Sequence, residues 1–135
     1  MLMRMIPTTV HAVADYATGA LLVVAPWIFA FSDESTAATW ISVLAGIAVL
    51  GMSAMTNYEG GFVAHAVTMR AHLMADAVMG AFLVAAPWLF GFADQGVNAW
   101  LPFVAIGLFE LLAAATTNPY SADPSLRGRE AARTI

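Results

Sequence analysis

Four long apolar segments dominate the chain and leave few folds open to it. They cover residues 9–31, 39–56, 71–92 and 100–117 of the 135-residue sequence. Each segment is close to the ~20 residues that a helix needs to cross the ~30 Å hydrocarbon core of a bilayer. Strands of a transmembrane barrel alternate apolar and polar residues over about ten positions, whereas these segments are apolar on every side. We therefore expect an all-α fold, a bundle of four transmembrane helices.

The composition supports the same class and excludes several others. Charged residues make up only 10% of the chain, whereas soluble domains carry about 25%, so we expect the lipid bilayer to be its main partner. The chain has five arginines, no lysine and a net charge of −4, which leaves no basic surface for nucleic acid. It has no cysteine, which excludes disulfides and thiolate metal sites.

The arginines are placed on one side of the expected helices. One precedes the first segment, one precedes the third, and three follow the fourth, at positions 4, 70, 127, 129 and 133. The other two turns, residues 32–35 and 94–96, contain acids and no arginine. By the positive-inside rule, both termini and the middle loop are cytoplasmic.

An internal duplication organises the chain. Residues 11–31 align without gaps to residues 72–92, and more than half of the positions are identical. The dipeptides Thr56-Asn57 and Thr117-Asn118 also match at the same offset. Each unit contains two crossings, so the copies have the same orientation and form a parallel repeat. We expect a first repeat at 1–58, a cytoplasmic loop or interfacial segment at 59–70, a second repeat at 71–118, and a disordered cytoplasmic tail at 119–135.

A repeated Ala-Pro-Trp element stands near the end of the first segment of each unit, at residues 25–27 and 86–88. With the aromatic-rich turn that follows it, this element resembles the SPW-repeat family of small bacterial membrane proteins, over residues 8–118. The family motif has serine where this chain has Ala25 and Ala86, so a role of that hydroxyl is not carried over. The resemblance implies a four-helix protein of the bacterial inner membrane and implies no established activity.

Two pairs of repeated residues point to structural roles around this element. Pro26 and Pro87 lie inside their helices, where each removes a backbone hydrogen bond and favours a kink. Trp27 and Trp88, with the aromatic residues that follow them up to positions 31 and 92, are typical of a belt at the membrane interface.

Gly19 and Gly80 are matched in the middle of the first and third segments. Small residues let helices approach closely in a bilayer, where lipid supplies no hydrophobic drive between them. We expect these glycines to pack the first and third helices together.

The strongest chemical signal is a repeated pair, His11 with Asp15 and His72 with Asp76. A spacing of four residues puts each imidazole and carboxylate on one helical face. Because ionisable groups inside a membrane are costly, such residues are functional candidates. All four can form an N2O2 set for zinc, iron or manganese. Alternatively, the two histidines can be axial ligands of a b-type haem, the pairs can be polar contacts between helices, or they can line a proton path.

Two further ionisable residues lack a counterpart in the other repeat. If the third helix begins near residue 62, His65 shares a face with His72 and Asp76; otherwise it is an interfacial residue. Glu110 lies near the middle of the fourth segment. It is either a proton carrier or subunit contact, or a neutral carboxyl bonded to Ser53, Thr18 or a backbone carbonyl.

Three functions follow from these patterns. The first is a structural or accessory protein with no catalytic domain, in a homo-oligomer or a larger membrane complex, because the water-exposed segments are too short for an enzyme. The second is a metal- or haem-binding membrane protein that uses the His-Asp pairs. The third is a conductor of protons or small ions that adds Glu110.

Overall fold

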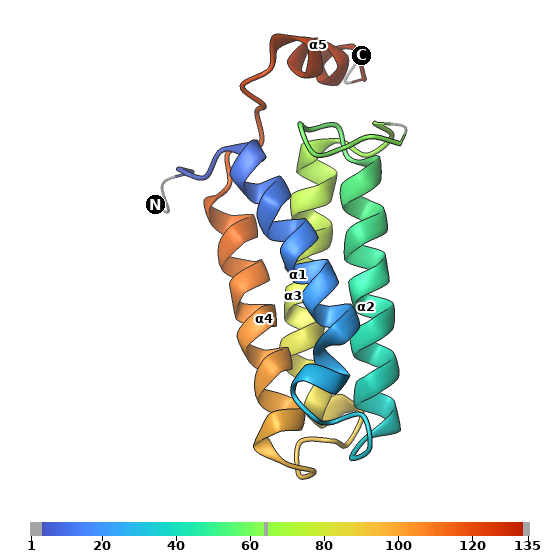
Figure 1. Cartoon of the computed structure of the whole chain (residues 1–135). Helices are drawn as coiled ribbons and strands as arrows, with labels where there is room; N and C mark the ends of the chain where they lie inside the picture. The colour runs from blue at the N-terminus through green and yellow to red at the C-terminus, as the bar shows by residue number, and fades with distance from the viewer. Residues whose placement is uncertain (1–3, 64, 134–135) are drawn as a thin grey trace.

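The computed structural model describes residues 4–63 and 65–133. Four long helices stand side by side as a bundle (Figure 1): α1 (Thr8–Ile28), α2 (Thr36–Met55), α3 (Met69–Leu89) and α4 (Val97–Thr116). Each is long and apolar enough to cross a membrane. The expected all-α fold of four transmembrane helices is confirmed, with boundaries that differ from the expected ones by up to three residues.

Polar caps explain where two of the helices begin. The Ser35 side chain accepts a hydrogen bond from the Ala38 amide at 3.1 Å, and the Thr68 side chain accepts one from the Ala71 amide at 3.2 Å. Such bonds satisfy amides that have no partner within the first helical turn. The cap at Ser35 starts α2 three residues before the apolar segment that predicted it.

The two Ala-Pro-Trp elements end α1 and α3. Pro26 has no amide proton for the Leu22 carbonyl, and the Ser42 hydroxyl of α2 donates to that carbonyl instead, at 2.6 Å. After the helix, the Phe31 amide donates to the Pro26 carbonyl at 2.9 Å, and the second repeat makes the same bond between Phe92 and Pro87. The prolines therefore help to turn the chain out of the helix, three residues earlier than the sequence predicted.

The mid-helix glycines pack the helices within each hairpin. A Cβ added at Gly46 would lie 2.6 Å from the Gly19 carbonyl oxygen, and one at Gly107 would lie 2.6 Å from the Gly80 carbonyl oxygen. Gly19 therefore serves the contact of α1 with α2, and Gly80 the contact of α3 with α4. The expectation that they join α1 to α3 is wrong, because each faces its own hairpin partner.

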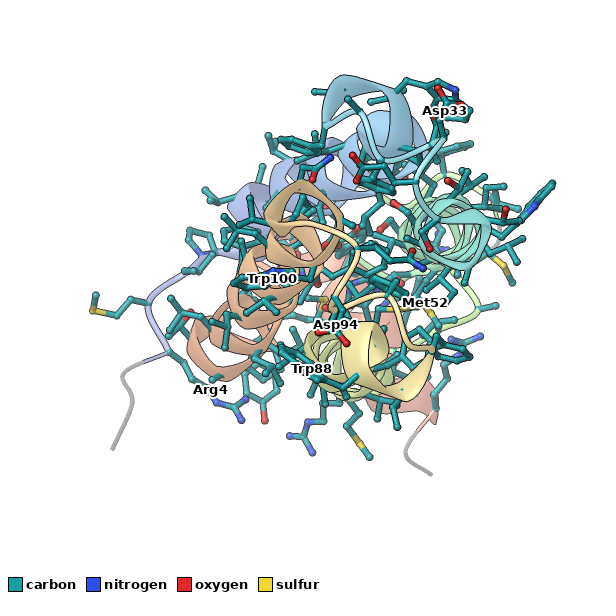
Figure 2. All side chains as sticks on the ribbon, turned by 90° about the horizontal axis from the view of Figure 1, so that it is seen from below. Arg4, Asp33, Met52, Trp88, Asp94 and Trp100 are labelled. Atoms are coloured by element: carbon teal, nitrogen blue, oxygen red, sulfur yellow. The ribbon has the colours of Figure 1, made fainter. Side chains whose placement is uncertain are left out.

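The half of the bundle nearest the two short turns has an apolar core. Phe31 and Phe92 are fully buried and lie with their ring centroids 5.9 and 4.9 Å from that of Phe103, so these two are core residues and do not belong to an interfacial belt. Trp27 and Trp88 are each 62% exposed, as belt residues are. Figure 2, seen from this end, shows Trp88 on the outside of the bundle and Asp94 in a turn.

The tail forms a fifth helix, α5 (Pro124–Arg133). It lies across the end of the bundle that carries the N-terminus and the α2–α3 loop (Figure 1). Leu126 of α5 is buried, and its carbonyl accepts a hydrogen bond from the Asn57 side chain at 3.0 Å. The expectation of a disordered tail is wrong, because the tail has a docking contact that its polar composition did not reveal.

Candidate metal centre

Four ionisable side chains meet in the bundle interior. His11 and Asp15 lie one turn apart on α1, and His72 and Asp76 lie one turn apart on α3. One ligand atom from each residue lies within 4.8 Å of the others, and all four residues are buried. We call these four residues the His-Asp cluster. The structure thus brings together the two pairs that the duplication pointed to.

Each imidazole faces both carboxylates. His11 Nε2 lies 3.1 Å from Asp15 Oδ1 and 3.0 Å from Asp76 Oδ2. His72 Nε2 lies 2.9 Å from Asp15 Oδ2 and 3.1 Å from Asp76 Oδ2. The contacts therefore run across the two repeats as well as within them, and the cluster ties the two hairpins together.

The second nitrogen of each imidazole is bound by a threonine from the other repeat. His11 Nδ1 lies 2.8 Å from Thr117 Oγ1, and His72 Nδ1 lies 2.7 Å from Thr56 Oγ1. Each threonine hydroxyl also donates to the carbonyl four residues earlier in its own chain segment. Because a hydroxyl has one proton, it must accept from the imidazole. Both histidines therefore carry a proton on Nδ1.

Backbone pairing places the two threonines beside the histidines. Parallel bridges join Ile6 to Thr117 and Val67 to Thr56. Ile6 and Val67 stand just before α1 and α3, and the threonines stand just after α4 and α2. The pairing holds the end of each hairpin against the start of the other. It explains why the matched Thr-Asn dipeptides recur in the sequence.

The arrangement leaves both Nε2 atoms in need of a cation. With Nδ1 protonated, a neutral imidazole presents a lone pair at Nε2, and a lone pair facing carboxylate oxygens is repulsive. Either a proton on Nε2 or a metal ion between the groups removes this repulsion. His72 Nε2 is buried and lies within 3.1 Å of a carboxylate oxygen from each aspartate. A cation at this nitrogen is therefore shared with both carboxylates.

The dimensions of the His-Asp cluster suit one metal ion. Metal bonds of about 2.0–2.1 Å to nitrogen and oxygen place tetrahedral ligands about 3.3 Å apart. The separations between the histidine and aspartate atoms are 2.9 to 3.1 Å, so a small expansion of these contacts accommodates the ion. The threonines supply the outer hydrogen bonds that orient metal-bound histidines in proteins.

The same geometry does not fit a b-type haem. The His11 and His72 ring centroids are 5.3 Å apart in an edge-on arrangement, and the carboxylates of Asp15 and Asp76 occupy the space between the two Nε2 atoms. A macrocycle between the imidazoles would have to displace both carboxylates and separate the hairpins. The cluster therefore favours a single ion over a haem.

A segment of the α2–α3 loop closes the cluster toward the end of the bundle that carries the arginines. We call residues 57–60 the cap segment. Its Tyr58 is fully buried and donates a hydrogen bond to Asp15 Oδ2 at 2.9 Å. Burial and the neighbouring Asp15 carboxylate raise the pKa of Tyr58 well above its usual range. The phenol therefore stays protonated and serves as a donor to the cluster.

Glu59 fastens the cap segment to both ends of the chain. The Thr8 hydroxyl donates to one of its carboxylate oxygens at 2.6 Å, and the Ser121 hydroxyl donates to the other. Burial opposes ionisation of Glu59, but these donors outweigh it and hold its pKa below the usual value. The ionised carboxylate thus links the loop, the start of α1 and the tail.

The remaining ionisable candidates lie outside the cluster. Because α3 begins at Met69, His65 lies in the α2–α3 loop and the condition for a helical face shared with His72 is not met. The alternative, that His65 is an interfacial residue, stays a prediction. Glu110 on α4 is buried, with 1% exposure, and its Cβ would lie 3.1 Å from a Cβ added at Gly80. The Ser53 hydroxyl, one of the partners expected for Glu110, donates its proton to the Val49 carbonyl.

Sequence reasoning assigned no role to three residues of this site. Thr56 and Thr117 were visible as a matched polar pair at the repeat offset, which is the signal that a shared partner exists. Tyr58 had no such signal, because Pro119 occupies the corresponding position of the second repeat. Its contact with Asp15 depends on how the loop folds back over the bundle.

Comparison with known proteins identifies a family but no individual relative. The SPW repeat domain matches residues 4–117. Neither curated proteins nor solved structures gave a match.

Proposed function

The chain belongs to the SPW repeat family, and we propose that this small membrane protein holds one divalent transition-metal ion between its two repeats. The observation that carries the proposal is the convergence of four buried ligand atoms, one from each residue of the His-Asp cluster, within 4.8 Å of one another. The Nδ1 atom of each histidine is committed to a threonine, so Nε2 is the nitrogen that faces the carboxylates. An ion at the centre of the cluster would bind both Nε2 atoms and both carboxylates together.

The ligand set indicates the kind of ion and the kind of role. Two imidazoles and two carboxylates suit zinc, and also iron or manganese. The chain supplies four ligands, and all of them are buried, which is typical of closed structural sites rather than catalytic sites with an open position. We therefore propose that the ion fastens the two hairpins and that the protein acts as a structural or accessory component, not as an enzyme.

We extend the proposal to the setting of the protein. All five arginines belong to segments at the end of the bundle that carries the termini and the α2–α3 loop. The positive-inside rule then supports a bacterial inner-membrane protein with both termini in the cytoplasm. The large apolar side chains on its outer surface suit lipid or a neighbouring subunit, so a homo-oligomer or a larger membrane complex is part of the same proposal.

Ion conduction has less support from the geometry. Between the His-Asp cluster and the two short turns, the bundle interior is filled by an apolar core that includes Leu22, Leu83 and Phe103. Glu110 on α4 is the one further ionisable residue of the described helices α1–α4 that is buried. Beyond the His-Asp cluster and Glu110, a proton would therefore find no further buried titratable group on the described helices α1–α4.

Metal titration of the solubilised full-length protein tests the proposal. Metal-free protein should bind about one zinc ion per chain, and the double variant Asp15→Asn/Asp76→Asn should lose this binding. Glu110→Gln is the matched control, because it converts a buried carboxyl of the same bundle to an amide outside the cluster, and it should bind as the unaltered protein does. Equal zinc binding by the unaltered protein and the Asp15→Asn/Asp76→Asn variant would overturn the proposal.

A further inference from the structure

A groove opens on the outer face of α3 and α4 at the arginine-bearing end. Its volume is about 900 Å³. Polar groups stand at its rim and apolar groups form its floor, and the residues that matter here are Arg4, Arg70, Tyr120, Met74, Ala77 and Leu111. The groove is separate from the His-Asp cluster, since none of the four cluster residues lines it.

Two arginines, Arg4 and Arg70, stand at the rim of the groove. Arg70 donates a hydrogen bond to the Tyr120 hydroxyl, and its guanidinium lies 5.5 Å from the centre of that ring. In the described residues, neither Arg4 nor Arg70 forms an ion pair with a carboxylate; the salt bridges there join histidine to aspartate. A guanidinium has several N–H donors in a planar fork that matches phosphate. The rim therefore presents unneutralised positive charge suited to a phosphate group.

The first repeat has a tyrosine where Ala77 lines the groove of the second repeat. Tyr16 occupies the position that corresponds to Ala77. Its ring stacks on Phe62 with a centroid distance of 6.5 Å, and its hydroxyl donates to the Gly60 carbonyl at 2.7 Å. The first repeat also has Thr9 where the second has Arg70. The second repeat thus combines an open groove with a cation at its mouth.

The length of the groove along α3 suits a phosphate followed by the first part of an acyl chain. Arg70 is the second residue of α3, and Ala77 lies seven residues farther along the helix, which corresponds to about 10 Å at 1.5 Å per residue. A phosphate at Arg70 would thus lie about one-third of the ~30 Å hydrocarbon thickness from Ala77. The first part of an acyl chain spans this distance.

We propose that this groove binds one anionic phospholipid. The phosphate lies between Arg4 and Arg70, and an acyl chain runs along Met74, Ala77 and Leu111. Basic pockets between membrane helices on the cytoplasmic side recognise such headgroups through the same chemistry. The proposal does not depend on metal binding, because the groove and the cluster share no residue.

Native mass spectrometry of the solubilised full-length protein tests the proposal. The protein is incubated with phosphatidylglycerol or with phosphatidylcholine, and the lipid retained per chain is measured. We expect one phosphatidylglycerol to be retained with at least about tenfold preference over phosphatidylcholine, as expected where charge recognition dominates. Glycerol 3-phosphate, which has the headgroup charge but no acyl chain, should not be retained. Equal retention of the two lipids would contradict the proposal, and so would retention of glycerol 3-phosphate.

Two variants with matched controls locate the site. Arg4→Gln/Arg70→Gln removes the cations, and Arg129→Gln removes a charge on the exposed tail outside the groove. Ala77→Tyr introduces the residue found at the matching position of the first repeat, and Leu108→Tyr adds the same ring to an exposed position of α4 that does not line the groove. The groove variants should lose the retained phosphatidylglycerol, and the controls should keep it.

The same spectra separate lipid from a second copy of the chain as the occupant. A folded Ala77→Tyr protein, identified by an unchanged helical circular dichroism spectrum, that still retains phosphatidylglycerol would overturn the proposal. A dimer that is lost in Ala77→Tyr and persists without lipid would also overturn it, because the groove would then hold another protein chain.

Discussion

Thr117, at the end of α4, holds the Nδ1 atom of His11, which lies 106 residues earlier in the chain, at 2.8 Å. Thr56 holds His72 in the same way from the end of α2. Each imidazole is therefore oriented by the repeat to which it does not belong. The His-Asp cluster is shared between the repeats, and neither repeat contains a complete set of ligands and orienting groups.

Removing the two threonine hydroxyls should weaken metal binding without removing a ligand. In Thr56→Val/Thr117→Val the side-chain shape is kept, but each imidazole loses the acceptor that fixes its tautomer. We expect zinc affinity to fall about 10–100-fold, as for other losses of outer-shell bonds. Calorimetric titration measures the change.

Thr116→Val provides the control for that variant. The Thr116 hydroxyl also donates to the carbonyl four residues earlier, but the residue is exposed and contacts no histidine. Its replacement should leave zinc affinity unchanged. If both variants lose zinc affinity equally, the loss comes from a disturbed helix end and not from the missing contact between threonine and imidazole.

Removal of the metal should loosen the junction between the hairpins. A ligand present at about 100 times its dissociation constant stabilises the folded state by about 2.7 kcal/mol. Treatment with a chelator should therefore lower the Tm of the unaltered protein, and added zinc should restore it. His72→Gln should show a low Tm that zinc does not raise. A chelator-insensitive Tm in protein shown to have lost its metal would speak against this role.

The glycine contact within the second hairpin should tolerate no side chain. In Gly107→Ala the new methyl group would lie 2.6 Å from the Gly80 carbonyl oxygen and 2.9 Å from the Val84 amide nitrogen. Because both neighbours are backbone, we expect a loss of about 1–3 kcal/mol in the free energy of unfolding. Thermal or denaturant unfolding in detergent measures the loss.

Gly51 is the matched control for the helix interior. A Cβ added at Gly51 has no neighbour within 4 Å, and alanine is the better helix former by about 1 kcal/mol. Gly51→Ala should therefore be neutral or stabilising. A destabilisation equal to that of Gly107→Ala would mean that backbone flexibility, not close helix contact, determines the effect.

The link made by Glu59 should depend on pH. Its pKa is lowered in the folded protein, so its contribution to stability is present above the unfolded-state pKa of about 4.3 and is lost as the pH falls through the folded value. Glu59→Gln should lower the Tm at about pH 7, by the equivalent of at most about 1 kcal/mol because the side chain is only partly buried and water screens the interaction. The difference between the two proteins should shrink toward pH 3. A constant difference across this range would contradict the ionic origin of the link.

The sequence was sufficient to predict the helices and the cluster because both depend on local spacing. The length of each apolar segment predicts a membrane helix, and the four-residue spacing of His11 and Asp15 places them on one face. The duplication then implies that His72 and Asp76 occupy an equivalent position across the bundle. These inferences use only segment length, residue spacing and the duplication, and none of them requires knowledge of contacts between distant segments.

The remaining features depend on packing between distant segments. Gly19 shows only that a close approach exists, and its partner Gly46 lies across the hairpin rather than on α3. Phe31 is aromatic and lies near a helix end, as belt residues do, but its side chain is buried in the core beside Phe103. The tail helix and the contact of Tyr58 with Asp15 arise where the loop and the tail fold over the bundle, and no periodic pattern reports such contacts.

The most direct test of the central claim is the metal content of the protein as it is purified. Elemental analysis of gently solubilised full-length protein should find about one zinc, iron or manganese ion per chain, and the Asp15→Asn/Asp76→Asn variant should contain none. An absorption spectrum of the same sample should lack a Soret band. Protein that contains no metal, and that takes up none after incubation with zinc, iron and manganese salts, would contradict the claim and leave the cluster as a network of polar contacts between the repeats.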